Sequence, residues 1–136
     1  LLLMNFFSKM FGDSDNKDSN ESSLMWNSLT ELKQLDEIAL ESNTIPVFIF
    51  KHSTRCSISR MALKGFEREY KLSETDAKLY FLDLLEHRDI SNEISTKFNV
   101  MHQSPQLLMI KKGHCLYHVS HSDIDATDLL SKINKV

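Results

Sequence analysis

The sequence predicts an α/β fold, with a mixed β-sheet covered by helices on both of its faces. Strand-like runs alternate with segments of helical periodicity, in the order β, α, β, α, β, α, β, β, α. Strand–helix–strand units of this kind form parallel strand pairs. Near the carboxyl end, Lys112-Gly113 offers a tight turn between two strand-like runs, which indicates an antiparallel hairpin. The sheet should therefore contain both parallel and antiparallel pairs.

The first half of the domain should hold two strand–helix pairs. Both helices show apolar residues at helical spacing, and Gly65 weakens the second of them near its middle. The strand before that helix is almost continuously apolar, as in strands buried on both faces. The predicted elements are a strand at 24–29, a helix at 30–42 capped by Thr30, a strand at 45–51 and a helix at 57–71.

The second half should add another buried strand, a helix, the hairpin and a last helix. Between Ile90 and Phe98, apolar residues recur every four positions, which indicates a helix. The predicted elements are a strand at 78–85, a helix from Asp89 or Ser91 to Phe98, strands at 106–111 and 114–119, and a last helix from Ser122 or Asp123 through Ile133.

Size and composition limit the classes of function. The 136 residues carry 16 basic and 19 acidic side chains, and the net charge of −3 gives no reason to expect a nucleic-acid partner. No apolar stretch reaches the ~20 residues of a membrane-spanning helix, and two cysteines do not make a disulfide scaffold, so we expect a cytoplasmic protein. We expect an apolar cap and a disordered polar linker over residues 1–23, and one folded domain over residues 24–136.

Cys56 has the clearest chemistry in the chain, because it follows the second predicted strand and directly precedes a predicted helix. Unpaired N–H groups and the helix dipole favour the thiolate there, which is the form that attacks disulfides. Arg55, Lys51 and His52 add positive charge just before it. Ser59 stands three residues later, where a dithiol oxidoreductase carries its second cysteine. This Cys-x-x-Ser pattern predicts redox chemistry with a single cysteine.

Neighbouring side chains have two possible roles each. The hydroxyl groups of Thr54 and Ser59 are candidates to donate to the thiolate, and Ser59 is the better candidate because it lies one turn along the helix. A serine near a helix start can instead bond to backbone. Arg55 either assists the thiolate or is a solvated loop charge. Cys115 reads as a core residue of a strand, beyond the ~7 Å Cα separation that a disulfide with Cys56 tolerates.

The element order, with a cysteine after the second strand and a proline opening the penultimate one, resembles the thioredoxin fold. More closely, the stretches 51–59, 82–83 and 102–106 resemble the bacillithiol-system YtxJ family, the monothiol bacilliredoxins, whose active site is of the Thr-Cys-Pro-Ile-Ser type. Here Arg55 precedes the cysteine, and Ser57 replaces the proline after it. The resemblance implies that Pro105 is cis and lies against Cys56, with the backbone of Ser104 as a docking edge for a disulfide-bearing substrate.

The resemblance also implies an activity. Cys56 would remove bacillithiol from mixed disulfides on client proteins, and a second bacillithiol or a reductase would reset it. Bacillithiol is then a thiol co-substrate, and neither a metal nor a bound cofactor is implied. His121 and His118 are candidates to contact the anionic malyl part of bacillithiol, although His121 is otherwise an exposed residue beside the last helix. The implied substrate site comprises His52, Thr54, Ser104, Pro105 and His121, with a possible contribution from His102.

Two other functions stay open at this stage. A non-enzymatic thioredoxin-like adaptor would bind partners through the Ser104-Pro105 edge and the apolar amino end, and it would have an unreactive Cys56. A monothiol glutaredoxin-like iron–sulfur carrier would share the fold, but such proteins carry Cys-Gly-Phe-Ser where this chain has Cys-Ser-Ile-Ser.

Overall fold

Five strands form one mixed sheet in the computed structural model, which describes residues 24–135. The strand order across the sheet is β1-β3-β2-β4-β5. The predicted cap and linker, residues 1–23, lie outside the described residues. The elements are β1 (Trp26–Ser28), α2 (Lys33–Glu41), β2 (Val47–His52), α3 (Ser57–Glu69), β3 (Lys78–Asp83), α4 (Arg88–Phe98), β4 (Gln106–Lys111), β5 (His114–Ser120), the 3-10 turn η2 (His121–Asp123) and α5 (Leu129–Lys135).

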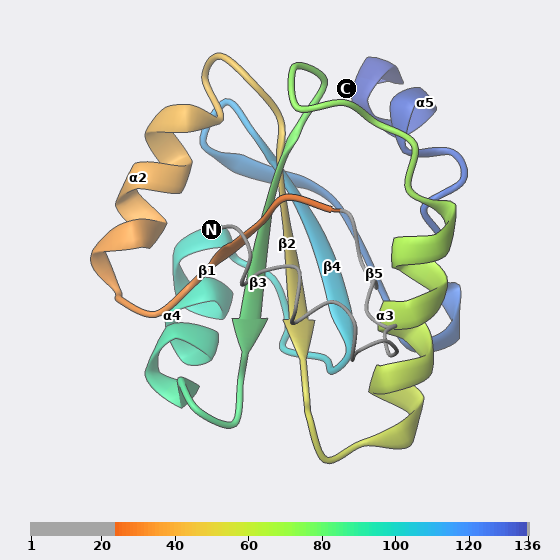
Figure 1. Cartoon of the computed structure of the whole chain (residues 1–136). Coiled ribbons are helices and arrows are strands. Elements are labelled where there is room, and N and C mark those ends of the chain that lie inside the picture. The colour runs from red at the N-terminus through yellow and green to blue at the C-terminus, as the bar shows by residue number, and fades with distance from the viewer. Residues whose placement is uncertain (1–23, 136) are drawn as a thin grey trace, which may run out of the picture.

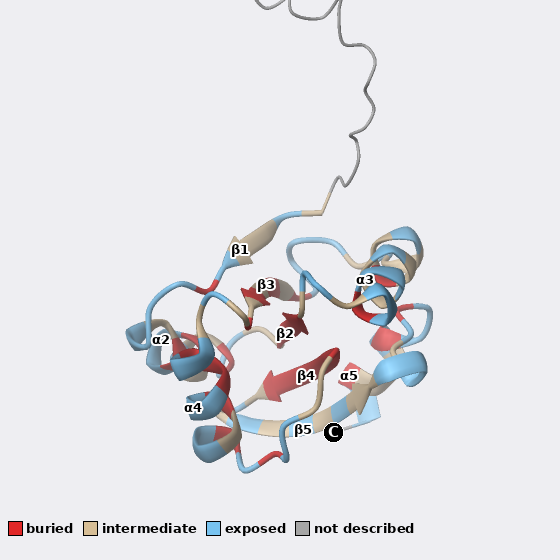
Figure 2. Ribbon diagram, turned by 90° about the horizontal axis from the view of Figure 1, so that it is seen from below, coloured by how far each residue is buried: buried red, intermediate tan, exposed pale blue. Residues whose placement is uncertain are grey.

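The predicted mixture of strand directions is present. Strand β3 pairs in parallel with β1 and β2, whereas β4 runs antiparallel to both β2 and β5. Helices α2 and α4 cover one face of the sheet, and α3 and α5 cover the other (Figure 1). This arrangement brings the carboxyl ends of β2 and β3 to the same end of the sheet as the start of β4, and Figure 2 is seen from that end.

Alternation along β2 explains why its whole length is apolar or buried. Val47 and Ile49 belong to the core under α2 and α4, whereas Phe48 and Phe50 belong to the core under α3 and α5. Successive strand side chains point to opposite faces, so a central strand with two covered faces buries every position. All six residues of β2 are buried (Figure 2).

An aromatic cluster joins β1 to the second of these cores. The Trp26 ring lies 6.1 Å from Phe50, 5.8 Å from Phe66 and 5.6 Å from Phe81, measured between centroids. Its indole Nε1 donates to Glu67 Oε2 at 2.8 Å. These contacts attach the three-residue edge strand β1 to β2, β3 and α3, and they satisfy the indole N–H as burial of tryptophan requires.

The predicted caps of the first two helices outside the site differ from the structure. Helix α2 begins at Lys33, and Thr30 does not cap it: Oε1 of Gln34 accepts the Thr30 N–H at 2.7 Å and the Glu31 N–H at 2.9 Å. The Gln34 side chain therefore holds residues 30–31, which precede the helix, and no side-chain hydrogen bond caps the start of α2. Helix α4 begins at Arg88, before both predicted caps, and ends at Phe98, where Asn99 follows in the left-handed conformation.

The prediction of a last helix from Ser122 or Asp123 was wrong. Residues 121–123 form a single 3-10 turn, the backbone is extended at Ile124, and α5 starts only at Leu129. The Asp125 carboxylate accepts both the N–H and the hydroxyl of Thr127, at 2.9 and 2.7 Å. This local side-chain turn competes with helical hydrogen bonding and delays the helix.

Candidate active site

Cys56 lies at the amino end of α3, as predicted. It is half-buried, its backbone is extended, and its C=O accepts the Arg60 N–H at 3.1 Å, which starts the helix. Its own N–H donates to the Ser53 C=O at 3.2 Å, so residues 53–55, the nucleophile loop, turn tightly from β2 into α3. The thiol therefore stands at the positive end of a 13-residue helix, where a thiolate is stabilised.

Ser59 is fully buried and holds the nucleophile loop from below. Its Oγ accepts the Ser53 N–H at 3.0 Å and lies 2.7 Å from His52 Nδ1. Burial lowers the pKa of His52, so the imidazole is neutral at pH 7 and one of its two nitrogens remains an acceptor. If His52 Nδ1 carries the proton, it donates to Ser59 Oγ, and the Ser59 hydroxyl can donate its own proton to the Cys56 thiolate. If Nδ1 is unprotonated, the Ser59 hydroxyl donates to Nδ1 instead. Donation from Ser59 to Cys56 stays a prediction.

Thr54 and Arg55 form the exposed tip of the nucleophile loop. The Thr54 C=O accepts from the Arg60 guanidinium at 3.3 Å, so α3 also holds this tip. Arg55 is exposed and forms no hydrogen bond or ion pair within residues 24–135. Both residues thus lie beside Cys56 with side chains open to a ligand.

Ser104 and Pro105 lie at the start of β4, joined by a cis peptide bond. Pro105 is buried, and its C=O accepts the His121 N–H at 3.0 Å. Gln106 pairs with Ser120, so the end of β5 returns to Pro105, as predicted from the hairpin. His121 is exposed next to this bond, whereas His118 lies opposite Leu108, two residues further along the hairpin. A contact of either histidine with bacillithiol stays a prediction.

Lys51 is the functional-site residue that sequence reasoning misplaced. We expected it to add charge beside Cys56, yet its side chain is 0 % exposed and reaches the other face of the sheet. Its Nζ lies 2.7 Å from His102 Nδ1 and donates to Gln106 Oε1 at 3.0 Å. Burial lowers the pKa of Lys51 to about 8. The only signal in the sequence is a lysine that ends an apolar strand.

Gln106 connects this lysine to the docking loop, residues 101–105. Its Oε1 also accepts the Gln103 N–H at 3.4 Å, and its Nε2 donates to the Met101 C=O at 3.1 Å. Burial, Lys51 and Arg88 together lower the pKa of His102, which keeps that imidazole neutral. Lys51 and Gln106 therefore hold the loop that carries Ser104 and Pro105.

Cys115 lies far from Cys56 along the sheet. It pairs with Ile110, which is opposite Val47 at the start of β2, whereas Gln106 at the site end is opposite Lys51. Ile110 and Gln106 are four strand residues apart, which is about 13 Å along the sheet. Cys115 at one end is therefore well beyond disulfide reach of Cys56 at the other. Both cysteines are free. Burial raises the pKa of the Cys115 thiol, so it is protonated at neutral pH.

Large apolar side chains are exposed in both segments that form the site. Ile58 and Met61 in the first turns of α3 are 57 % and 72 % exposed, and Met101 in the docking loop is 77 % exposed. Large apolar groups that gather in solvent are typical of a surface that binds a macromolecule.

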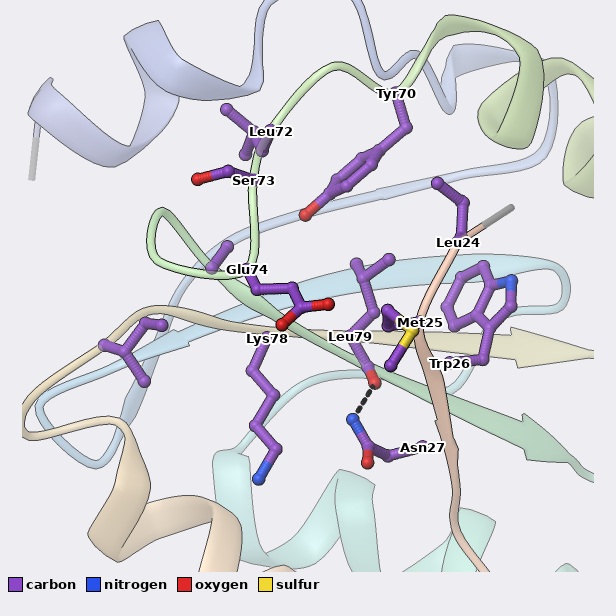
Figure 3. A pocket seen from close by; sticks show the side chains of 12 residues that line it. Leu24, Met25, Trp26, Asn27, Tyr70, Leu72, Ser73, Glu74, Lys78 and Leu79 are labelled. Carbon is purple, nitrogen blue, oxygen red and sulfur yellow. Dashed lines mark hydrogen bonds between the residues drawn. The ribbon is translucent and has the colours of Figure 1, made fainter. Parts of the chain in front are cut away.

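Two hollows differ in their relation to this site. The larger, of about 430 Å³, lies among Trp26, Ile45, Tyr70 and Lys78 at the opposite end of the sheet, and Figure 3 shows its lining. The smaller, of about 370 Å³, adjoins the nucleophile loop at Thr54 and Arg55. Among residues 24–135, no group of three or more His, Cys, Asp or Glu side chains could hold a metal ion. None of the helices in this range is long and apolar enough to cross a membrane.

Comparison with known proteins decides the family. A family model described as monothiol bacilliredoxin BrxC matches residues 27–129. The chain belongs to the monothiol bacilliredoxin family. A solved structure described as a putative oxidoreductase with a thioredoxin fold is 33 % identical and has a TM-score of 0.66, with 78 % of this chain and 91 % of that chain covered.

Thioredoxins provide further similar structures. The thioredoxin of Malassezia sympodialis is 17 % identical, with a TM-score of 0.64 and 84 % of this chain and 92 % of that one covered. The thioredoxin of Trypanosoma brucei brucei is 20 % identical, with a TM-score of 0.57 and 88 % and 96 % covered. At these identities the likeness concerns the fold alone. The predicted family and thioredoxin fold are confirmed, and the bacilliredoxin family supports a redox role.

Proposed function

We propose that this bacilliredoxin-family chain is a thiol–disulfide oxidoreductase that removes bacillithiol from client proteins in a reducing cytosol. The observation that carries the proposal is the position of Cys56 at the amino end of α3, with buried Ser59 where a second cysteine would stand. A thiolate is favoured at that position, and no resolving thiol is within reach among the described residues.

The reaction has two exchange steps. The Cys56 thiolate attacks the bacillithiol sulfur of a mixed disulfide; the client–bacillithiol S–S bond breaks, a Cys56–bacillithiol S–S bond forms, and the client leaves as a thiolate that takes up a proton. A second bacillithiol thiolate then attacks the adduct, which releases bacillithiol disulfide and regenerates Cys56. A separate reductase must supply two electrons to the released disulfide.

Each part of the site has a role in this scheme. Ile58, Met61 and Met101 offer apolar contact to the client. The backbone of Ser104, beside cis Pro105 and just before β4, offers groups along which client backbone can lie. Ser59 and His52 keep the nucleophile loop in place while the sulfur is attacked.

Mass spectrometry after incubation with bacillithiol disulfide tests this proposal. We expect one bacillithiol adduct on Cys56 at pH 7, which excess bacillithiol removes. Cys56→Ala should form no adduct, and the matched control Cys115→Ala should behave as the wild type, because Cys115 is distant and protonated. A folded wild-type protein that forms no adduct contradicts the proposal and leaves a binding role for the domain.

A further inference from the structure

The smaller hollow combines residues from two segments far apart in the sequence. Thr54 and Arg55 belong to the nucleophile loop, and the other wall is the turn that follows β3 and the first residue of α4. Arg55 directly precedes Cys56 in the chain, so the hollow lies next to the residue that carries the thiol. Its volume of about 370 Å³ lies within the range of roughly 300–1,000 Å³ typical of small-molecule sites. The lining residues are Thr54, Arg55, Asp83, Leu85, Glu86 and Arg88.

Four charged side chains of this hollow do not neutralise one another. Within residues 24–135, the guanidinium groups of Arg55 and Arg88 form no hydrogen bond and no ion pair. Among the described residues, the Asp83 carboxylate accepts only the Leu85 N–H, at 3.2 Å, and the Glu86 carboxylate accepts no hydrogen bond. Elsewhere on the surface, oppositely charged neighbours do pair, as Lys97 does with Asp36 at 2.7 Å. Cations and carboxylates thus face one hollow and are free to bind a ligand.

The position of Arg88 is also unfavourable for its own helix. It is the first residue of α4, where the partial positive charge of the helix disfavours a cation. It is exposed, and its charge helps to lower the pKa of His102. A cation that weakens its own helix and pairs with no carboxylate is better explained by a ligand than by folding.

We propose that this hollow binds the charged end of the low-molecular-weight thiol that is exchanged at Cys56. Arg55 and Arg88 bind the carboxylates of this thiol, and the carboxylates of Asp83 and Glu86 accept hydrogen bonds from its ammonium group. The ligand class is a small thiol or disulfide with several carboxylates, which the malyl part of bacillithiol satisfies. This inference rests on the proposed function and adds a reason for selectivity: guanidinium groups hold carboxylates in paired hydrogen bonds that uncharged disulfides cannot form.

Rates of adduct formation on Cys56 test the inference. We would measure them for bacillithiol disulfide and for uncharged hydroxyethyl disulfide, with the wild type, Arg88→Ala, Arg88→Lys and Arg68→Ala. Arg68 is the matched control, an exposed arginine near the far end of α3. We expect Arg88→Ala to lower the ratio of the two rates about tenfold, as for loss of a charge-assisted hydrogen bond. Arg88→Lys should restore part of the ratio, and 0.5 M salt should reduce it in the wild type.

Binding without chemistry provides the second readout. Reduced bacillithiol titrated into Cys56→Ala should shift the backbone amide signals of Glu86 and Arg88 in NMR spectra, and hydroxyethyl disulfide should not. A wild type that reacts with both disulfides, while Arg88→Ala and Arg68→Ala give the same ratio, overturns the binding site and leaves the proposed function standing. A wild type that reacts with neither disulfide overturns the proposed function, and unshifted signals for Glu86 and Arg88 overturn the binding site separately.

Discussion

Lys51 and His52 are neighbours at the end of β2, both are buried, and they serve opposite faces of the sheet. His52 bonds to Ser59 and so supports the nucleophile loop. Lys51 bonds to His102 and Gln106 and so supports the docking loop. The His52 partner is seven residues away in the sequence, whereas the Lys51 partners are 51 and 55 residues away. One strand end therefore positions both halves of the site, through a local neutral contact on one face and a long-range charged contact on the other.

Removing the hydroxyl under the nucleophile loop should give the largest effect on stability. Ser59→Ala leaves the buried His52 Nδ1 and the Ser53 N–H without their partner. Such groups cost about 1–3 kcal/mol each in the worst case, so we expect the free energy of unfolding to fall by about 2 kcal/mol in urea titrations. Ser57→Ala, at the exposed start of the same helix, is the control. If both variants lose the same free energy of unfolding, the hydrogen bonds of Ser59 to His52 and Ser53 do not stabilise the fold as expected.

Removing the charge under the docking loop should act on the loop rather than on the whole fold. Lys51→Met keeps a similar volume but cannot donate to Gln106. At pH 7 we expect the free energy of unfolding to stay within about 1 kcal/mol, because the lost hydrogen bonds are offset by removal of a buried charge. Exchange of the Gln103 amide hydrogen should become about fivefold faster, as for loss of about 1 kcal/mol. Unchanged exchange there would contradict the role of Lys51, and Ser59→Ala should leave this amide unaffected.

The difference in charge between the two faces should appear as a small dependence on pH. The pKa of Lys51 is about 8 in the folded chain and 10.5 for a free lysine. Between these values the unfolded chain binds more protons, so the stability of the wild type rises with pH from about 8 to 10.5, and it levels off below the folded pKa. From pH 7 to 9, the wild type should gain about 1 kcal/mol or less relative to Lys51→Met. Parallel stability profiles of the two proteins would show that the amine does not titrate in this range.

Local patterns predicted most of the fold. The bounds of β4 at 106–111 agree with the prediction because Pro105 and Lys112-Gly113 mark both ends in the sequence. The predicted start of the last helix was wrong for a reason that is also local. Asp125 and Thr127 form a hydrogen-bonded turn within a stretch of helical spacing. Apolar periodicity does not reveal which of two local hydrogen-bonding patterns is more stable.

The candidate site also contains a local part, which the sequence predicts, and a long-range part, which it does not. Cys56 and Ser59 were accessible to sequence reasoning because a strand, a turn and a helix follow one another there. The contact of Lys51 with His102 and Gln106 was not, because it depends on β4 lying antiparallel to β2 in one register. The hollow between Arg55 and Arg88 likewise requires that the turn after β3 lies next to the nucleophile loop.

The aromatic cluster around Trp26 allows intrinsic tryptophan fluorescence to report on one edge of the sheet. The chain contains a single tryptophan, so its fluorescence has one source. That indole touches rings from β2, β3 and α3 and belongs to the shortest strand of the sheet, at its edge. Detachment of β1 alone would expose it to water and shift its emission to longer wavelengths, while circular dichroism would change little. Emission and circular dichroism recorded together thus separate fraying of this edge from collapse of the whole sheet.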